Sequence, residues 1–199
     1  MSIQAQCVPI NRASFTFISH VFCSLFCSCS SPNKFPPRHV INQKEYERLL
    51  PLAYQWAKTQ EDFILARGAS LGPQHTADAR LVGVQDCSRV KVLVVDRIPL
   101  PENAELAQAA RQRHIITDAS PGIAIGHGIV IRADSWSDRE LILHQLVHVA
   151  QCERSGGLES FVQQYLSDRQ ICANFTAGSL EDEARRMARE ICASVEVVN

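Results

Sequence analysis

The spacing of apolar residues predicts a long helix in the first part of the chain. From residue 42 to about residue 67, apolar side chains recur every three or four positions with charged residues between them, the period of an amphipathic helix. Pro51 falls inside this stretch, and we expect it to bend the helix. Gly68 ends the pattern, and Gly72-Pro73 predicts a loop after it.

The middle of the chain alternates β-type and helical patterns. A β-branched run over residues 89–98 is short enough for a buried strand, and residues 103–113, rich in Ala, Leu and Gln, predict a short helix. Two further β-type runs, 123–125 and 129–131, flank Gly126-His127-Gly128. Short apolar runs around a glycine-flanked centre are typical of a hairpin.

Helical patterns dominate the last third of the chain. Ser137 is the predicted N-cap of a strongly apolar helix, with Glu140 as its capping-box partner, and this helix should stop near Gly156. Two further helices are expected over 158–170 and, behind Ser179, over 180–192.

The N-terminal segment differs from the rest of the chain. Arg12 precedes a Phe-, Cys- and Ser-rich stretch over residues 13–29, an order that resembles a secretory signal, although His20 and many serines make it poorly hydrophobic. A dispensable leader or an upstream start codon is the alternative. We therefore expect residues 1–40 to be a leader and residues 41–199 to form one domain. Without a clean cleavage motif we favour a cytoplasmic protein, exported if the leader is a signal.

Composition excludes several functional classes. The chain of 199 residues has a net charge of −1, so no overall basic field attracts nucleic acid or an anionic membrane. No run of eighteen apolar residues occurs beyond the leader, which excludes a polytopic membrane protein. Half of the eight cysteines crowd the leader, including Cys27-x-Cys29, a weak metal motif, and the others are spread singly, unlike a disulfide framework.

The candidate chemistry lies in the apolar helix after the hairpin. His144 and His148 are one turn apart, about 6 Å along the axis and about 40° around it, so both imidazoles can reach one ion. Such a pair also arises by chance among seven histidines, and its alternative is a pair of core histidines satisfied by other partners. Context favours a metal, because two unpartnered imidazoles in an apolar helix would be costly to desolvate.

The order of elements strengthens this interpretation. A hairpin precedes the His-x-x-x-His helix, and a later helix carries Glu181 and Glu183. Two histidines from one helix and one glutamate from another can hold zinc with an open fourth position for water. For both glutamates the alternative role is purely electrostatic, because acidic residues are favoured at helix N-termini.

The region from about residue 90 to 188 resembles the zincin metallopeptidases of the gluzincin type, closest to small uncharacterised bacterial domains with an HELxHVxQ signature. Residues 144–151 match that signature except at Gln145, and residues 181–184 match the ExxA element. The resemblance implies an α+β fold with a short β-sheet packed on the HxxxH helix and a Glu-bearing helix. It also implies zinc held by His144, His148 and Glu181, with Glu183 as the fallback ligand.

Gln145 departs from the family at the position of its catalytic glutamate. That glutamate takes a proton from zinc-bound water, whereas an amide can hydrogen-bond the water but cannot accept its proton. General-base catalysis contributes about 10² to 10⁴ in rate, or roughly 3 to 5 kcal/mol, so the sequence predicts weak or absent hydrolysis. Metal binding does not depend on this position.

Three other residues near the motif invite a role. Cys152 is about 12 Å along the helix from His144, too far to share its ion, so we assign it to the core. His127, at the hairpin turn, could hydrogen-bond a substrate, but a histidine at a turn tip is usually exposed. Tyr165 could act as an electrophile, yet an aromatic on an amphipathic helix usually packs.

The sequence thus leads to a zinc-binding metallopeptidase-like protein whose hairpin edge takes an extended peptide by β-augmentation. The alternative is a non-catalytic peptide- or protein-binding module on the same scaffold, which Gln145 favours over turnover. A third interpretation is a helical structural protein without metal.

Overall fold

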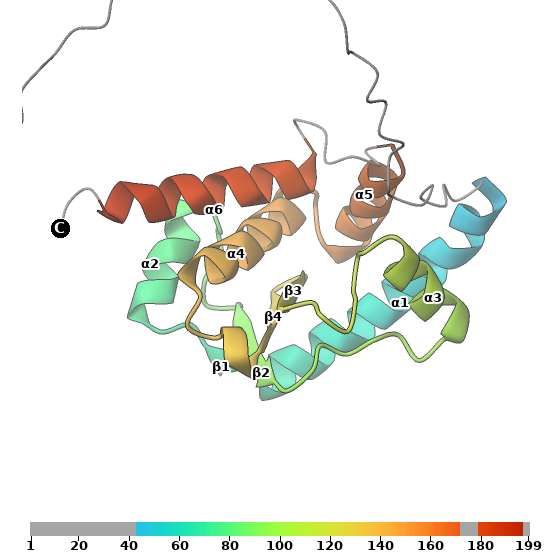
Figure 1. Cartoon of the computed structure of the whole chain (residues 1–199), viewed down its shortest axis with the longest axis horizontal. Coiled ribbons are helices and arrows are strands. Elements are labelled where there is room, and N and C mark those ends of the chain that lie inside the picture. Colours follow the sequence, from blue (N-terminus) through green and yellow to red (C-terminus); the bar gives the residue numbers. More distant parts are fainter. Residues whose placement is uncertain (1–42, 172–178, 197–199) are drawn as a thin grey trace, which may run out of the picture. The chain divides into compact units, whose positions relative to one another are not determined.

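The computed structural model describes residues 43–171 and 179–196, all within one compact unit spanning residues 37–199 (Figure 1). The expected leader, residues 1–40, lies outside the described part. The helices are α1 (Gln43–Arg67), α2 (Pro73–Leu81), α3 (Ala104–Gln112), α4 (Arg139–Arg154), α5 (Leu158–Ile171) and α6 (Leu180–Glu196), with a short 3₁₀ turn η1 (Ala133–Ser135). The strands are β1 (Ala69–Ser70), β2 (Lys91–Val95), β3 (Gly122–Ile125) and β4 (Gly128–Arg132). The predicted α+β class is therefore confirmed.

The four strands form one mixed sheet in the order β1-β2-β4-β3. β3 and β4 form the predicted antiparallel hairpin around a two-residue turn, with Ile125 opposite Gly128. β2 runs parallel to β4, with Val92 opposite Ile129, and β1 adds a short antiparallel strand on the far side. Strand β3 is consequently an edge of the sheet.

Successive side chains of β4 pack against different helices on the two faces of the sheet. Ile129 and Ile131 are fully buried in a core shared with the apolar side of α4, including Leu143 and Leu146. Val130, between them, belongs to a second cluster with Ile64 of α1. Because successive side chains of a strand point to opposite faces, α4 and α1 cover the sheet from opposite sides.

The N-terminal helix follows the sequence pattern, but the next element differs. Helix α1 continues through Pro51. Residues expected to be a loop after Pro73 form α2, with the proline at the first helical turn, where its missing N–H costs nothing. Few apolar residues mark α2. A long-range contact holds it instead, because buried Asp78 accepts two hydrogen bonds from Arg139.

The start of α4 corrects a second expectation. Asp138, not Ser137, is the N-cap, and its carboxylate accepts a hydrogen bond from the Leu141 backbone N–H at 3.1 Å. Glu140 does not close a capping box; it lies 3.3 Å from Arg189 of α6. At α6 the prediction is confirmed, since the Ser179 hydroxyl accepts from the backbone N–H of Asp182. Among the described helices, none has the length and apolarity needed to cross a membrane.

Candidate metal centre

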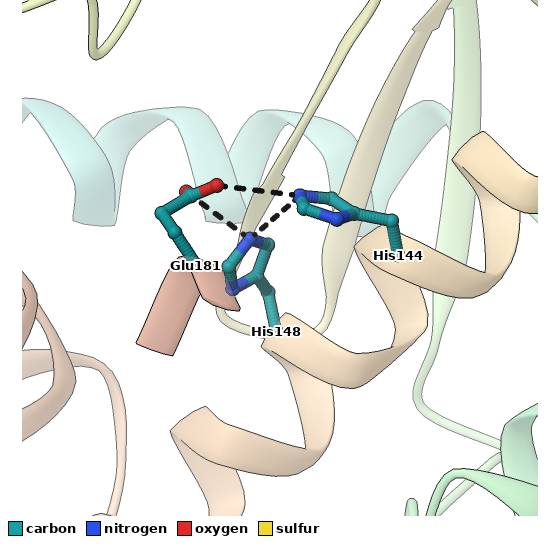
Figure 2. A group of neighbouring side chains, drawn as sticks. All are labelled: His144, His148 and Glu181. Atoms are coloured by element: carbon teal, nitrogen blue, oxygen red, sulfur yellow. Dashed lines mark hydrogen bonds and ion pairs between the residues drawn. The ribbon is translucent and has the colours of Figure 1, made fainter. Parts of the chain in front are cut away.

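Helix α4 directs two histidines toward the N-terminal end of α6. His144 and His148 lie one turn apart, and their Nε2 atoms are 3.1 Å from each other (Figure 2). The His148 side chain is buried, while the His144 side chain remains 20% exposed. An apolar helix thus places both rings close together, as the spacing predicted, and both line a cavity.

Glu181 completes the group from the first turn of α6. Its carboxylate oxygens lie 3.6 Å from His144 Nε2 and 3.4 Å from His148 Nε2. Helix α6 can approach α4 closely because Ala184 and Ala188 are fully buried in the core it shares with α4. The three side chains point toward one another from two helices (Figure 2).

The spacing of the three groups matches a small tetrahedral ion. Ligands bonded to zinc at roughly 2.0–2.2 Å are separated by about 3.3–3.6 Å at the edges of a tetrahedron. Here the two Nε2 atoms are 3.1 Å apart, and each lies close to a different oxygen of Glu181, at 3.6 Å for His144 and 3.4 Å for His148. Within the described residues, His144, His148 and Glu181 make up the one group of three or more side chains arranged so that they could hold a metal ion.

The electrostatics of the site favour the protonation states that a metal needs. Burial, reinforced by the neighbouring His148, lowers the pKa of His144 to about 4, so its ring is neutral near pH 7. Burial alone would raise the pKa of Glu181, but its contacts with His148 and Tyr165 outweigh burial and hold the pKa well below its ordinary value. A neutral imidazole and an ionised carboxylate both offer lone pairs to a cation.

Glu183, the fallback ligand, lies away from this group. One of its oxygens accepts from Gln151 Nε2 at 2.8 Å and the other from Arg154 at 2.7 Å. Residues two apart on a helix face different directions, so only one of the two glutamates can reach the histidines. The structure therefore favours Glu181 over Glu183 as the candidate ligand, in agreement with the spacing of Glu181 to Ala184.

Tyr165 contacts the group from α5. Its hydroxyl donates a hydrogen bond of 2.5 Å to Glu181, and its ring lies edge-on to the His148 ring, with centroids 5.9 Å apart. The ring of Tyr165 therefore packs, as an aromatic on an amphipathic helix usually does. Its hydroxyl, for which an electrophilic role was considered, hydrogen-bonds a candidate ligand.

Gln145 occupies the cavity wall beside the histidines. Its side chain is buried, and in the described part of the chain no hydrogen bond to its amide is found. It lines the same cavity as His144 and His148. A buried amide without a partner normally costs stability, so its donor and acceptor are available to a bound molecule.

A cavity of about 520 Å³ opens from the candidate metal group. Most of its lining is apolar and comes from α1, α3, α5 and the edge strand β3. In the register of the hairpin, Ile123 and Ile125 hydrogen-bond to β4, so Ala124 directs its backbone N–H and C=O away from the sheet. The cavity thus combines apolar walls, an open strand edge and the three clustered side chains.

His127 is not exposed, contrary to expectation. It is 8% exposed, and its Nε2 lies 3.0 Å from Glu153 of α4, while its backbone N–H donates to Glu61 of α1. This turn histidine is therefore an internal ion-pair partner in a cluster separate from the candidate metal group. Cys152 is buried as predicted, and burial raises the pKa of its thiol to about 12.

Sequence reasoning missed the residues that act through long-range contacts. Gln151 is fully buried and contacts His148 and two acceptors on α6. The sequence marks it as an amide inside an apolar run and as the last position of the HELxHVxQ signature, but indicates no role for it. Glu61 carried no signal, since its partner is 66 positions away.

Comparison of the chain with protein-family models, with curated proteins and with solved structures finds no match.

Proposed function

We propose that this protein binds one zinc ion through His144, His148 and Glu181 and is related in mechanism to zincin metallopeptidases, with weak or no hydrolytic activity. The observation that carries the proposal is that two packed helices bring two imidazole nitrogens and one carboxylate close enough together to bind a single ion. All three residues also line the cavity, which leaves a side from which a fourth ligand can approach.

The donor set suits zinc better than calcium or magnesium. Two imidazoles and one carboxylate are typical of catalytic zinc, whereas calcium and magnesium prefer oxygen ligands alone. Bound zinc would polarise a carbonyl group and lower the pKa of water. The chain's own part is to supply His144 as a neutral ring, to hold Glu181 through Tyr165, and to keep bulk water out with the apolar walls.

An extended peptide is the ligand class that the cavity favours. The free N–H and C=O of Ala124 on the edge strand offer main-chain hydrogen bonds, and strand addition to such an edge is a common mode of peptide recognition. The apolar lining favours large aliphatic or aromatic side chains on that peptide.

Gln145 supports a second candidate function, a non-catalytic peptide-binding module on the same scaffold. Its buried amide can donate to a peptide carbonyl and accept from a peptide N–H, but it cannot take a proton from water. Binding without turnover uses every feature of the site except a general base. The two candidates share the scaffold and differ in the fate of the bound peptide; the binding module could act with or without zinc.

Elemental mass spectrometry of the purified full-length protein tests the metal. We expect about one zinc per chain, lost in His144→Ala, His148→Ala and Glu181→Ala, because removal of one of three ligands typically abolishes stable binding. Asp182→Ala, a change of the adjacent acidic residue, is the matched control and should retain zinc. No zinc after metal-free purification and add-back would contradict the metallopeptidase candidate and leave a binding module or a structural scaffold without metal.

A further inference from the structure

Gln151 joins the two helices that carry the candidate ligands. It lies on α4 three residues after His148 and is 1% exposed. Its Oε1 is 2.8 Å from His148 Nδ1, and its Nε2 is 2.9 Å from the Leu180 carbonyl oxygen and 2.8 Å from Glu183 Oε2. Every polar atom of this buried side chain is therefore engaged within the protein.

The contacts on α6 determine which way the Gln151 amide faces. A carbonyl oxygen only accepts hydrogen bonds, and so does a carboxylate, which Glu183 presents while Arg154 donates to its other oxygen. The NH₂ group of the amide must face both acceptors. A flipped amide would place its oxygen against the Leu180 carbonyl oxygen and Glu183 Oε2. Both acceptors would then lose the hydrogen bond from Gln151, which is costly for buried groups.

The orientation of the amide in turn determines the tautomer of His148. Gln151 Oε1 can only accept, so the Nδ1 atom that contacts it at 2.8 Å must carry the proton. In a neutral ring the lone pair is then on Nε2, the atom that faces His144 and Glu181.

We infer that Gln151 is a positioning residue, which holds His148 as the Nδ1–H tautomer and aims its Nε2 lone pair at the point shared with His144 and Glu181. The same side chain binds the carbonyl of Leu180, the residue before Glu181, and so fixes the position of two ligands on different helices. The use of this arrangement for metal rests on the proposed function, whereas the tautomer is a property of the metal-free protein.

The contact between the two histidines agrees with this assignment. With the His148 Nε2 unprotonated, the His144 Nε2 can donate to it across their 3.1 Å separation. Across the described residues, His144 Nδ1 has no hydrogen-bond partner comparable to Gln151. Of the two rings, His148 is therefore the one with a fixed tautomer, and His144 is the one that must exchange its Nε2 proton when a cation binds.

Nitrogen-15 NMR of the histidine rings in the metal-free full-length protein tests the inference, with the His148 signals assigned by their loss in His148→Ala. The Glu181 carboxylate, 3.4 Å from Nε2, favours a proton on Nε2 and so opposes Gln151. We expect Gln151 to prevail, so that the neutral wild-type ring carries its single proton at Nδ1. In Gln151→Met, which keeps the length of the side chain without its polar atoms, the ring should shift toward the Nε2–H form. Zinc affinity, measured by competition with a chromophoric chelator, should fall about 10- to 100-fold.

Val149→Ala provides the control for a merely structural effect. Val149 is fully buried on the same helix, so its truncation destabilises the core, yet it should change neither the tautomer nor the zinc affinity. If Gln151→Met does not fold, Glu183→Ala removes one of the two acceptors that orient the amide and should move the same two readouts in the same direction by less.

Two results would overturn the inference. One is a wild-type His148 protonated at Nε2, and the other is a Gln151→Met variant with the tautomer and zinc affinity of the wild type. A wild-type protein that binds no zinc would contradict the proposed function, and the tautomer measurement would still decide the role of Gln151.

Discussion

The backbone N–H of His127 donates a 3.0 Å hydrogen bond to the Glu61 carboxylate, and the ring of the same histidine reaches Glu153 on another helix. One residue in the hairpin turn thus connects α1, the β3–β4 hairpin and the end of α4. Glu153 also accepts from the backbone N–H groups of Gln85 and Asp86. This cluster holds in place the hairpin whose outer strand borders the cavity.

The turn leaves no room for a side chain next to His127. Gly126 has a φ of +60°, and a Cβ atom there would lie 1.9 Å from Glu61 Oε1. Gly126→Ala should therefore lose about 2–4 kcal/mol of unfolding free energy in urea titrations, from backbone strain and a disrupted buried hydrogen bond. Gly83→Ala is the control, because Gly83 also has a positive φ but open space around it. An equal loss in both variants would rule out the contact with Glu61 as the cause.

The same cluster predicts a pH dependence of stability. Contact with Glu61 outweighs desolvation and raises the pKa of His127. The protonated ring therefore adds its full share to the free energy of unfolding below the ordinary pKa of 6.5, and this share is lost as the pH rises through the raised pKa. Despite burial, contacts with His127 lower the pKa of Glu61, so its contribution is complete above the ordinary value of 4.5 and is lost as the pH falls. Stability from the pair should be greatest between these two values.

Thermal unfolding across this range provides the measurement. The wild-type Tm should fall as the pH rises above neutrality, and His127→Gln should have a lower Tm with a weaker dependence on alkaline pH. The same slope in both proteins would place the titrating group elsewhere.

Restoring a carboxylate at position 145 should restore any latent hydrolysis. Gln145→Glu supplies the base that the proposed reaction lacks, and we expect turnover of apolar peptides to rise by about 10² to 10⁴. Mass spectrometry of the products checks this, and His148→Ala in the same background should abolish the gain. A zinc-loaded Gln145→Glu protein that gains no hydrolysis while the parent binds peptide would favour the binding module.

Cys152 should be chemically inert in the folded protein. Its thiol is 2% exposed, and burial raises its pKa to about 12, so little thiolate exists at about pH 8. Alkylation followed by peptide mapping should therefore leave Cys152 unmodified until denaturant is added. Fast labelling of this residue under native conditions would indicate local opening at the C-terminal end of α4.

Local patterns predicted the elements that local forces decide. The period of α1, the glycine-flanked hairpin and the one-turn spacing of His144 and His148 are properties of short windows, and the structure has all of them. The α+β class, which the resemblance to zincins implied, agrees with these elements. Metal chemistry could be hypothesised for the same reason, since residues four apart on a helix face the same direction.

Partners distant in sequence decided the rest. Helix α2 has little apolar periodicity and depends on Asp78 meeting Arg139, and His127 is buried because Glu61 and Glu153 surround it. Nothing local separates Ser137 from Asp138 as a cap, since both residue types serve that role. For Gln151, the sequence shows a polar residue in an apolar run but not the acceptors on α6 that give it a function.

The parallel pairing of β2 with β4 sets an order for the folding of the sheet. The β3–β4 hairpin closes over two residues, whereas Val92 meets Ile129 only after the chain has traversed α3 and the whole connection that follows it. The entropy of closing that long loop must be lost before the pairing contributes any stabilising contact. The hairpin can therefore act as a local nucleus, and truncation of Val92 should accelerate unfolding more than it slows folding.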